Sequence, residues 1–105
     1  MTKLDHEIAA QLKARLSTVA RLVDFRVFGS RARGDADEYS DMDVFIEVES
    51  IDETIERKIR DAVWQTGFEH DRYISPLIFT RHELEETPLR SAPIVKNIAL
   101  EGVKI

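Results

Sequence analysis

The stretch that decides the fold is FRVFGSRARGDADEYSDMDVFIEVE, residues 25–49. An apolar run ends in the pair Gly29–Ser30, and ten residues later Asp41 and Asp43 open a second apolar run. Side chains alternate between the two faces of a β-strand, so Asp41 and Asp43 are expected to point the same way. The stretch therefore predicts two strands joined by a polar loop, with two carboxylates side by side at the start of the second strand.

The carboxylate pair and the Gly-Ser turn have complementary chemistry. Two neighbouring carboxylates repel each other, and a bound cation relieves the cost of ionising both. Oxygen ligands suit Mg²⁺, which proteins hold with one or two carboxylates plus substrate phosphates. A glycine allows close backbone approach, and free N–H groups at the start of a helix bind phosphate oxygens. We therefore expect Asp41 and Asp43 to bind a metal, Gly29 and Ser30 to contact phosphates, and the reaction to be phosphoryl or nucleotidyl transfer.

The spacing GS, ten residues, DxD resembles the signature of the DNA polymerase β-like nucleotidyltransferase superfamily. The short chain resembles its minimal nucleotidyltransferases, antitoxins that are found beside small helical HEPN-domain toxins. The resemblance covers almost the whole chain and implies an α/β fold with a small mixed sheet backed by helices. It also implies that Asp41 and Asp43 are catalytic metal ligands and that Gly29, Ser30 and Arg33 bind the nucleotide. The implied reaction is Mg²⁺-dependent transfer of NMP, in particular AMP from ATP, to a hydroxyl acceptor such as a tyrosine of a HEPN partner.

A third carboxylate is the point at which the sequence departs from that family pattern. Similar enzymes usually place a third acid on a neighbouring strand, and here the expected strand is YISPLIF, residues 73–79, with Ser75 near the expected position. Asp71 lies four residues earlier, on the same strand face by parity, and could reach the site if the strand begins early. Asp71 is therefore the candidate third catalytic residue, and a turn or helix-cap acid is the alternative. Without a third acid, catalysis is weakened or a partner supplies the missing group.

Two arginines follow the Gly-Ser turn directly. The planar guanidinium of Arg31 or Arg33 suits phosphate oxygens, so either residue could contact a triphosphate. The alternative for each is an ion pair at the protein surface. Arg33 matches a position that is often basic in similar sequences.

Length and composition restrict the function further. The 105 residues are expected to form one domain, residues 1–105, and a chain of this size buries roughly 60–70% of its unfolded surface. The net charge of −5 argues against a general nucleic-acid binder. The chain has no cysteine, so it offers no thiol nucleophile and no thiolate metal site. No apolar run approaches a membrane span, so we expect a cytoplasmic protein without a membrane partner.

Hydrophobic periodicity sets the expected order of elements. Apolar residues recur every three or four positions over residues 4–23, which predicts an amphipathic helix. A strand at 25–28, a helical turn at 30–33, a loop at 34–40 and a strand at 42–48 are predicted to follow. The next predicted elements are a helix capped by Ser50 and ended by Gly67, and an edge strand at 73–79 that contains Pro76. The last two are a short helix at 82–86, preceded by a Thr80–Glu83 capping box, and a helix that Ser91 caps and Gly102 ends. This order fits an α/β sandwich with a small mixed sheet.

Three functions follow from these observations. The first is an active Mg²⁺-dependent nucleotidyltransferase, favoured by the intact GS and DxD elements. The second is a degenerate transferase that masks the same partner without turnover, favoured by Ser75 in place of an acid. The third is a plain interaction domain without nucleotide, which leaves the spacing of the DxD pair unexplained.

Overall fold

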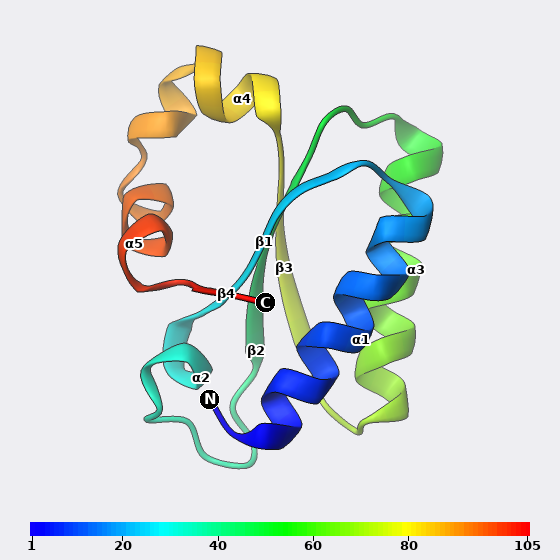
Figure 1. Cartoon of the computed structure of the whole chain (residues 1–105), viewed down its shortest axis with the longest axis vertical. Helices are drawn as coiled ribbons and strands as arrows, with labels where there is room; N and C mark the ends of the chain where they lie inside the picture. Colours follow the sequence, from blue (N-terminus) through cyan, green and yellow to red (C-terminus); the bar gives the residue numbers. More distant parts are fainter.

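A four-stranded mixed sheet lies at the centre of the computed structural model, which describes all 105 residues (Figure 1). The strand order is β3-β2-β1-β4. Strand β2 pairs antiparallel with β1 and parallel with β3, and β4 pairs antiparallel with β1. The strands span β1 (Leu22–Phe28), β2 (Met42–Val48), β3 (Ile74–Thr80) and β4 (Val103–Lys104). The predicted α/β class with a small mixed sheet is confirmed; the short β4 was not predicted.

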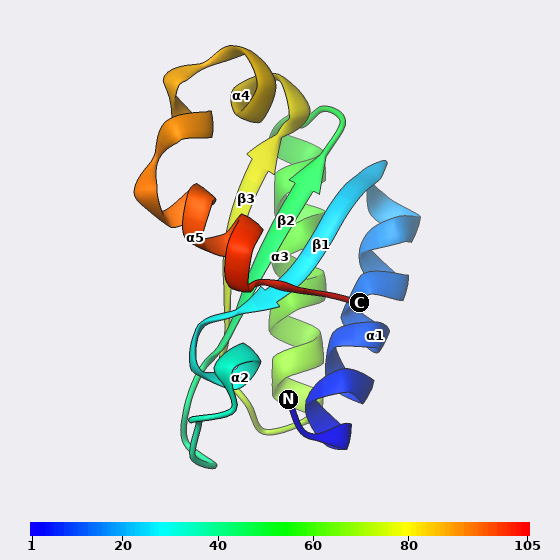
Figure 2. The same ribbon diagram turned by 60° about the vertical axis from the view of Figure 1, so that its left-hand side comes forward.

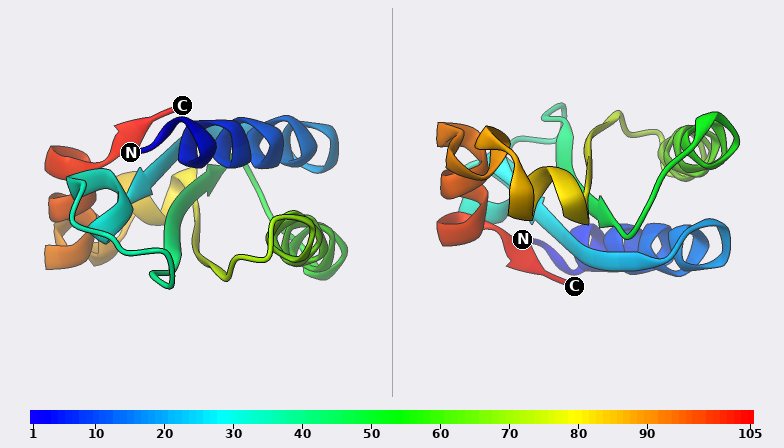
Figure 3. Two further views of the ribbon diagram at one scale, coloured as in Figure 1. Left: turned by 90° about the horizontal axis from the view of Figure 1, so that it is seen from below. Right: turned by 90° about the horizontal axis from the view of Figure 1, so that it is seen from above.

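The helices divide between the two sides of the sheet. They are α1 (Lys3–Val19), α2 (Gly29–Arg33), α3 (Glu53–Glu69), α4 (Arg81–Glu86), the 3₁₀ helix η1 (Pro88–Ser91) and α5 (Pro93–Glu101). Helices α1 and α3 pack together on one face, and α4, η1 and α5 lie on the other side (Figures 1 and 3). Helices α2 and α5 contact each other near the end of β1 (Figure 2). None of the helices combines the length and the apolar character that a membrane crossing requires.

The hydrophobic core lies between the sheet and the pair α1 and α3. Alternate side chains of β2 are fully buried in it, and α1 contributes a stripe spaced by three or four residues. These buried residues are Met42, Val44, Ile46 and Val48 of β2 and Ile8, Leu12 and Leu16 of α1. Because side chains alternate along a strand, the buried set sends Asp43 to the opposite face, away from α1 and α3.

Two predicted element boundaries are wrong near the start of the sheet and of α3. Helix α1 ends at Val19 because Ala20 is extended, with φ −151° and ψ 159°, and Leu22 already pairs with Val48. Asp52 caps α3 instead of Ser50, since its side chain accepts a hydrogen bond from the backbone N–H of Ile55 at 2.8 Å.

The second half of the chain contains two further errors and two confirmed predictions. Ser91 lies in η1 and does not cap α5, which Ala92 precedes without a side-chain cap. The Thr80–Glu83 capping box before α4 is confirmed. Pro76 lies in β3, at the edge of the sheet, as its missing N–H requires. The prediction that Gly67 ends α3 is wrong, because the helix continues as far as Glu69.

Candidate active site

The Gly-Ser turn and the carboxylate pair meet where β1 passes into α2. Gly29 has φ +74°, a conformation that side-chain-bearing residues rarely adopt, and a Cβ there would overlap the carboxylate of Asp43. The register of the sheet explains this proximity, because Phe28 of β1 is directly opposite Asp43 of β2. The ten residues between Ser30 and Asp41 therefore form the loop that returns the chain to the same end of the sheet.

A cavity of about 390 Å³ opens beside this contact. One wall comes from the predicted site residues Gly29, Ser30, Arg33 and Asp43. The opposite wall comes from α5, through Ile94, Asn97, Ile98 and Glu101. The volume is within the ~300–1,000 Å³ range of small-molecule sites. The sequence did not indicate that the last helix would form this wall.

The carboxylate of Asp43 lies in an environment that disfavours its negative charge. Burial of the group and the neighbouring charge of Asp41 raise the pKa of Asp43, and the charge of Arg33 opposes this shift. Asp43 is half-buried and Asp41 is exposed, so the pair is open on its solvent side. The two adjacent carboxylates repel each other, and a bound cation would relieve this repulsion. Both offer only oxygen ligands, which fit Mg²⁺, and substrate phosphates and water can fill its remaining coordination positions.

The structure does not place a third carboxylate beside this pair. Ser75 is the β3 residue directly opposite Asp43. Asp71 lies in the turn before β3 with φ 50°, and it lines a different cavity together with Trp64 and Phe68. An early start of the strand was the condition under which Asp71 could reach Asp43, and this condition is not met, because β3 begins only at Ile74. No group of three potential metal-ligating side chains occurs in the chain.

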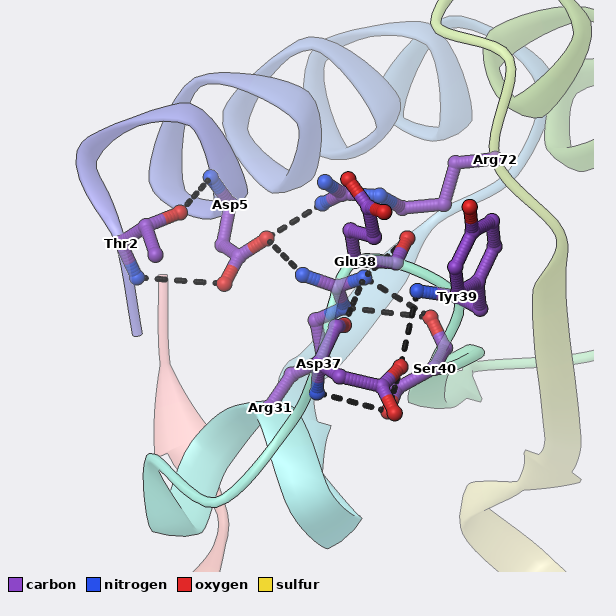
Figure 4. Close-up of polar contacts among 8 residues, drawn as sticks. All are labelled: Thr2, Asp5, Arg31, Asp37, Glu38, Tyr39, Ser40 and Arg72. Carbon is purple, nitrogen blue, oxygen red and sulfur yellow. Dashed lines mark hydrogen bonds and ion pairs between the residues drawn. The ribbon is translucent and has the colours of Figure 1, made fainter.

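Arg31 is a structural residue and does not face the cavity. Its guanidinium, only 5% exposed, donates from Nη2 to the carbonyl oxygens of Ser40 at 2.9 Å and Asp37 at 3.1 Å (Figure 4). Its Nη1 lies 3.1 Å from Oδ1 of Asp5. Since Ser40 directly precedes Asp41, Arg31 holds in place the loop that positions Asp41 and Asp43.

Asp5 holds this arrangement together from the first turn of α1. It accepts hydrogen bonds from the backbone N–H of Thr2 and from Arg72, and it is 2% exposed (Figure 4). Burial alone would raise the pKa of Asp5, but the hydrogen bonds from Thr2 and Arg72 and the charges of Arg31 and Arg72 lower it overall. The network thus ties α1, the loop before β2 and the segment before β3 to one buried carboxylate. The sequence analysis missed this network, and the one local sign of it is the capping box that Thr2 and Asp5 form at the start of α1.

Arg33 is the arginine that faces the cavity. Its side chain is 49% exposed and forms an exposed ion pair with Asp35, with Nε 3.3 Å from Oδ2. Its positive charge lowers the pKa of Asp43 and so opposes the rise that burial and Asp41 cause. An exposed pair of this kind contributes little stability, so Arg33 can turn to a bound anion at small cost.

Comparisons with known proteins bear on the family and on the fold. The sequence model of the family described as "Nucleotidyltransferase domain" matches residues 7–105. A protein of Methanocaldococcus jannaschii named "Putative protein adenylyltransferase" is 38% identical over an alignment 78 residues long, which covers 71% of this chain and 79% of that protein. A chain in a crystal structure of a toxin–antitoxin with AMP-PNP superposes with a TM-score of 0.59. The superposition covers 95% of this chain and 70% of the other at 19% identity, so it bears on the fold alone.

Proposed function

This chain belongs to the nucleotidyltransferase domain family, and from that premise we propose that it transfers AMP from ATP to a protein hydroxyl group with Mg²⁺ as cofactor. The acceptor in this proposal is a tyrosine of a helical HEPN-domain toxin, which makes the chain an antitoxin. The observation that supports it best is the shared cavity, in which Asp43 lies against the Gly29–Ser30 turn.

Each site residue has a role in this reaction. The backbone of Gly29 and the hydroxyl of Ser30 would bind the β- and γ-phosphates, with Arg33 as a further cation. Asp41 and Asp43 would hold Mg²⁺, which when bound neutralises charge on the phosphates. The acceptor oxygen attacks the α-phosphorus, the bond to the β-phosphate oxygen breaks, and pyrophosphate leaves while the acceptor proton passes to solvent. Positioning the phosphates against the acceptor is the main contribution of the protein in such a transfer.

An exposed aromatic cluster supports a protein as the acceptor. Trp64 and Phe68 stack on the outer side of α3 with ring centroids 5.2 Å apart, and Tyr73 lines the same cavity. All three are about 70% exposed, and such residues are enriched in protein interfaces. The chain at Tyr73 runs beside the start of β2, because the N–H of Met42, which lies between Asp41 and Asp43, donates to the carbonyl of Tyr73 at 3.0 Å. A partner docked here would present its hydroxyl groups near Asp41 and Asp43.

Inhibition of the same partner by masking, without turnover, is the second candidate function. The observation that favours it is Ser75, which occupies the position opposite Asp43 where an acid would complete a carboxylate triad. A masking protein would need the aromatic cluster and would not need the charge of Asp41 and Asp43.

Co-expression with a helical HEPN-domain protein, the proposed partner, distinguishes the two functions. For the transferase, intact-mass spectrometry should show the partner heavier by one or more AMP groups, and the Asp41→Asn/Asp43→Asn variant should leave it unmodified. Asp61→Asn is the matched control, because Asp61 is an exposed residue of α3 that lines neither the active-site cavity nor the cavity of the aromatic cluster. An unmodified partner, combined with full protection by the double variant, would establish masking instead.

A further inference from the structure

We propose that the cavity-facing side of α5 binds the nucleoside of the nucleotide, with Asn97 recognising the adenine base and Glu101 the ribose. This inference rests on the proposed function and assigns the part of the substrate that the Gly-Ser turn and the carboxylate pair do not bind.

The two walls of the cavity differ in chemistry. The wall from β1, α2 and β2 offers a glycine turn, a hydroxyl, a guanidinium and a carboxylate, which suit phosphates and a cation. A nucleoside triphosphate also has an uncharged, aromatic end that needs apolar surface and a few hydrogen-bonding groups. Helix α5 is the remaining wall, so the nucleoside faces it when the phosphates occupy the turn.

The residues of α5 that line the cavity form one helical face. Positions 94, 97, 98 and 101 follow the i, i+3, i+4, i+7 spacing of a single stripe. Ile94, 47% exposed, and Ile98 supply apolar surface against which a base can lie. Asn97 and Glu101 are exposed, one turn apart, and neither makes a side-chain hydrogen bond within the chain. Both polar groups are therefore free for a ligand.

The side-chain chemistry indicates which nucleoside fits. A carboxamide carries one acceptor and two donors, so Asn97 can pair with the N6 amine and N7 of adenine. Guanine presents two acceptors at the same edge, which one carboxamide cannot satisfy in that manner. An ionised carboxylate only accepts hydrogen bonds, so Glu101 suits the donating hydroxyl groups of a ribose.

Helix α5 is held firmly enough to act as a binding wall. Nη1 of Arg26 donates to the carbonyl oxygen of Ala99 at 3.2 Å, while its Nε pairs with Asp24 at 3.0 Å. The N–H of Gly102 donates to the carbonyl of Ile98 at 2.8 Å, and β4 then continues the chain along β1. A wall fixed to the sheet in this way loses little freedom on binding.

Equilibrium binding to purified variants tests the inference without reference to turnover. Four probes are titrated in the presence of Mg²⁺: ATP, GTP, 2′-deoxy-ATP and inorganic tripolyphosphate. We expect wild type to prefer ATP to GTP. Asn97→Ala should lower the affinity for ATP about tenfold, as the loss of a bidentate base contact does, and should remove the preference for ATP over GTP. Glu101→Gln should reduce the difference in affinity between ATP and 2′-deoxy-ATP.

Two controls separate this inference from the function on which it rests. Tripolyphosphate should bind all variants alike, and Lys96→Ala, on the same helix but outside the cavity, should bind every probe as wild type does. Equal affinity of wild type for ATP and GTP, or an unchanged ratio in Asn97→Ala, would overturn the role of α5 while nucleotide binding stands. Absence of any nucleotide binding by wild type would overturn both the role of α5 and the proposed function.

Discussion

Replacing Asp5 by asparagine removes one negative charge from the centre of the buried network and keeps the shape of the side chain. In wild type this carboxylate faces the guanidinium groups of Arg31 and Arg72, whose side chains are 5% and 12% exposed. In the variant both cations face a neutral amide. The capping bond to the backbone N–H of Thr2 can still form, because the amide oxygen accepts it.

The expected loss of stability is large for a single substitution. Removing one partner of a buried ion pair costs ~3–5 kcal/mol, because the remaining charge loses its compensation. Arg31 keeps its bonds to the carbonyl of Ser40, and Arg72 retains some solvent contact, so we expect the lower end, about 3 kcal/mol. A folded chain of this length is stable by ~5–15 kcal/mol, so the variant should still fold.

Urea denaturation at pH 7 measures this loss directly. The matched control is Glu56→Gln, which breaks the exposed pair with Arg60, 49% and 57% exposed, and should cost less than about 0.5 kcal/mol. The pH dependence gives a second test. The pKa of Asp5 is lower in the folded chain than its ordinary value of 3.8, so as the pH falls the unfolded chain binds the proton first.

The stabilisation by Asp5 is therefore complete above pH 3.8 and is lost as the pH falls through the folded-state pKa. The difference in unfolding free energy between wild type and Asp5→Asn should stay constant near neutrality and narrow in acid. A cost below about 1 kcal/mol would refute the assignment of a buried ion-pair network. So would a difference that does not narrow between pH 5 and pH 3.

Two further predictions concern the turn and the metal. Gly29→Ala should destabilise the chain more than Gly34→Ala: both glycines have positive φ, but only at Gly29 would a Cβ overlap Asp43. Equal melting temperatures for the two variants would contradict that close approach. ATP binding followed by calorimetry should depend on Mg²⁺, and Asp43→Asn should remove the Mg²⁺-dependent part, since two carboxylates hold the ion only together with phosphates. Unchanged ATP affinity in chelator would refute the assignment of the metal ligands.

The part of the site that local pattern determines was predictable from the sequence. The alternation of apolar and polar residues along β2 gives both the strand and the common direction of Asp41 and Asp43. The Gly29–Ser30 pair marks the turn into α2 because its geometry requires a glycine. These signals act within a few residues, so no knowledge of the tertiary structure is needed to read them.

The remaining parts depend on contacts between distant segments, which periodicity does not encode. Asp5 and Arg72 are 67 positions apart, and nothing in their neighbours indicates that they pair. In the sequence, Asn97 and Glu101 indicate only the polar side of an amphipathic helix. Their position in the cavity results from the packing of α5 beside α2. The position of Asp71 was uncertain for a related reason: parity along a strand predicts the direction of a side chain only within the strand, and β3 begins at Ile74.

The two arginines after the turn show how helix geometry assigns roles that composition leaves open. Successive residues of an α-helix are rotated by about 100°, so residues two apart point in nearly opposite directions. Arg31 and Arg33 of α2 therefore cannot both face the cavity. One must turn toward the interior, where a buried guanidinium is tolerated only with a carboxylate partner, and Asp5 is that partner. The carboxylate on α1 thereby determines which arginine is free to meet a phosphate: with Arg31 committed to the interior, Arg33 is the one that α2 leaves at the cavity.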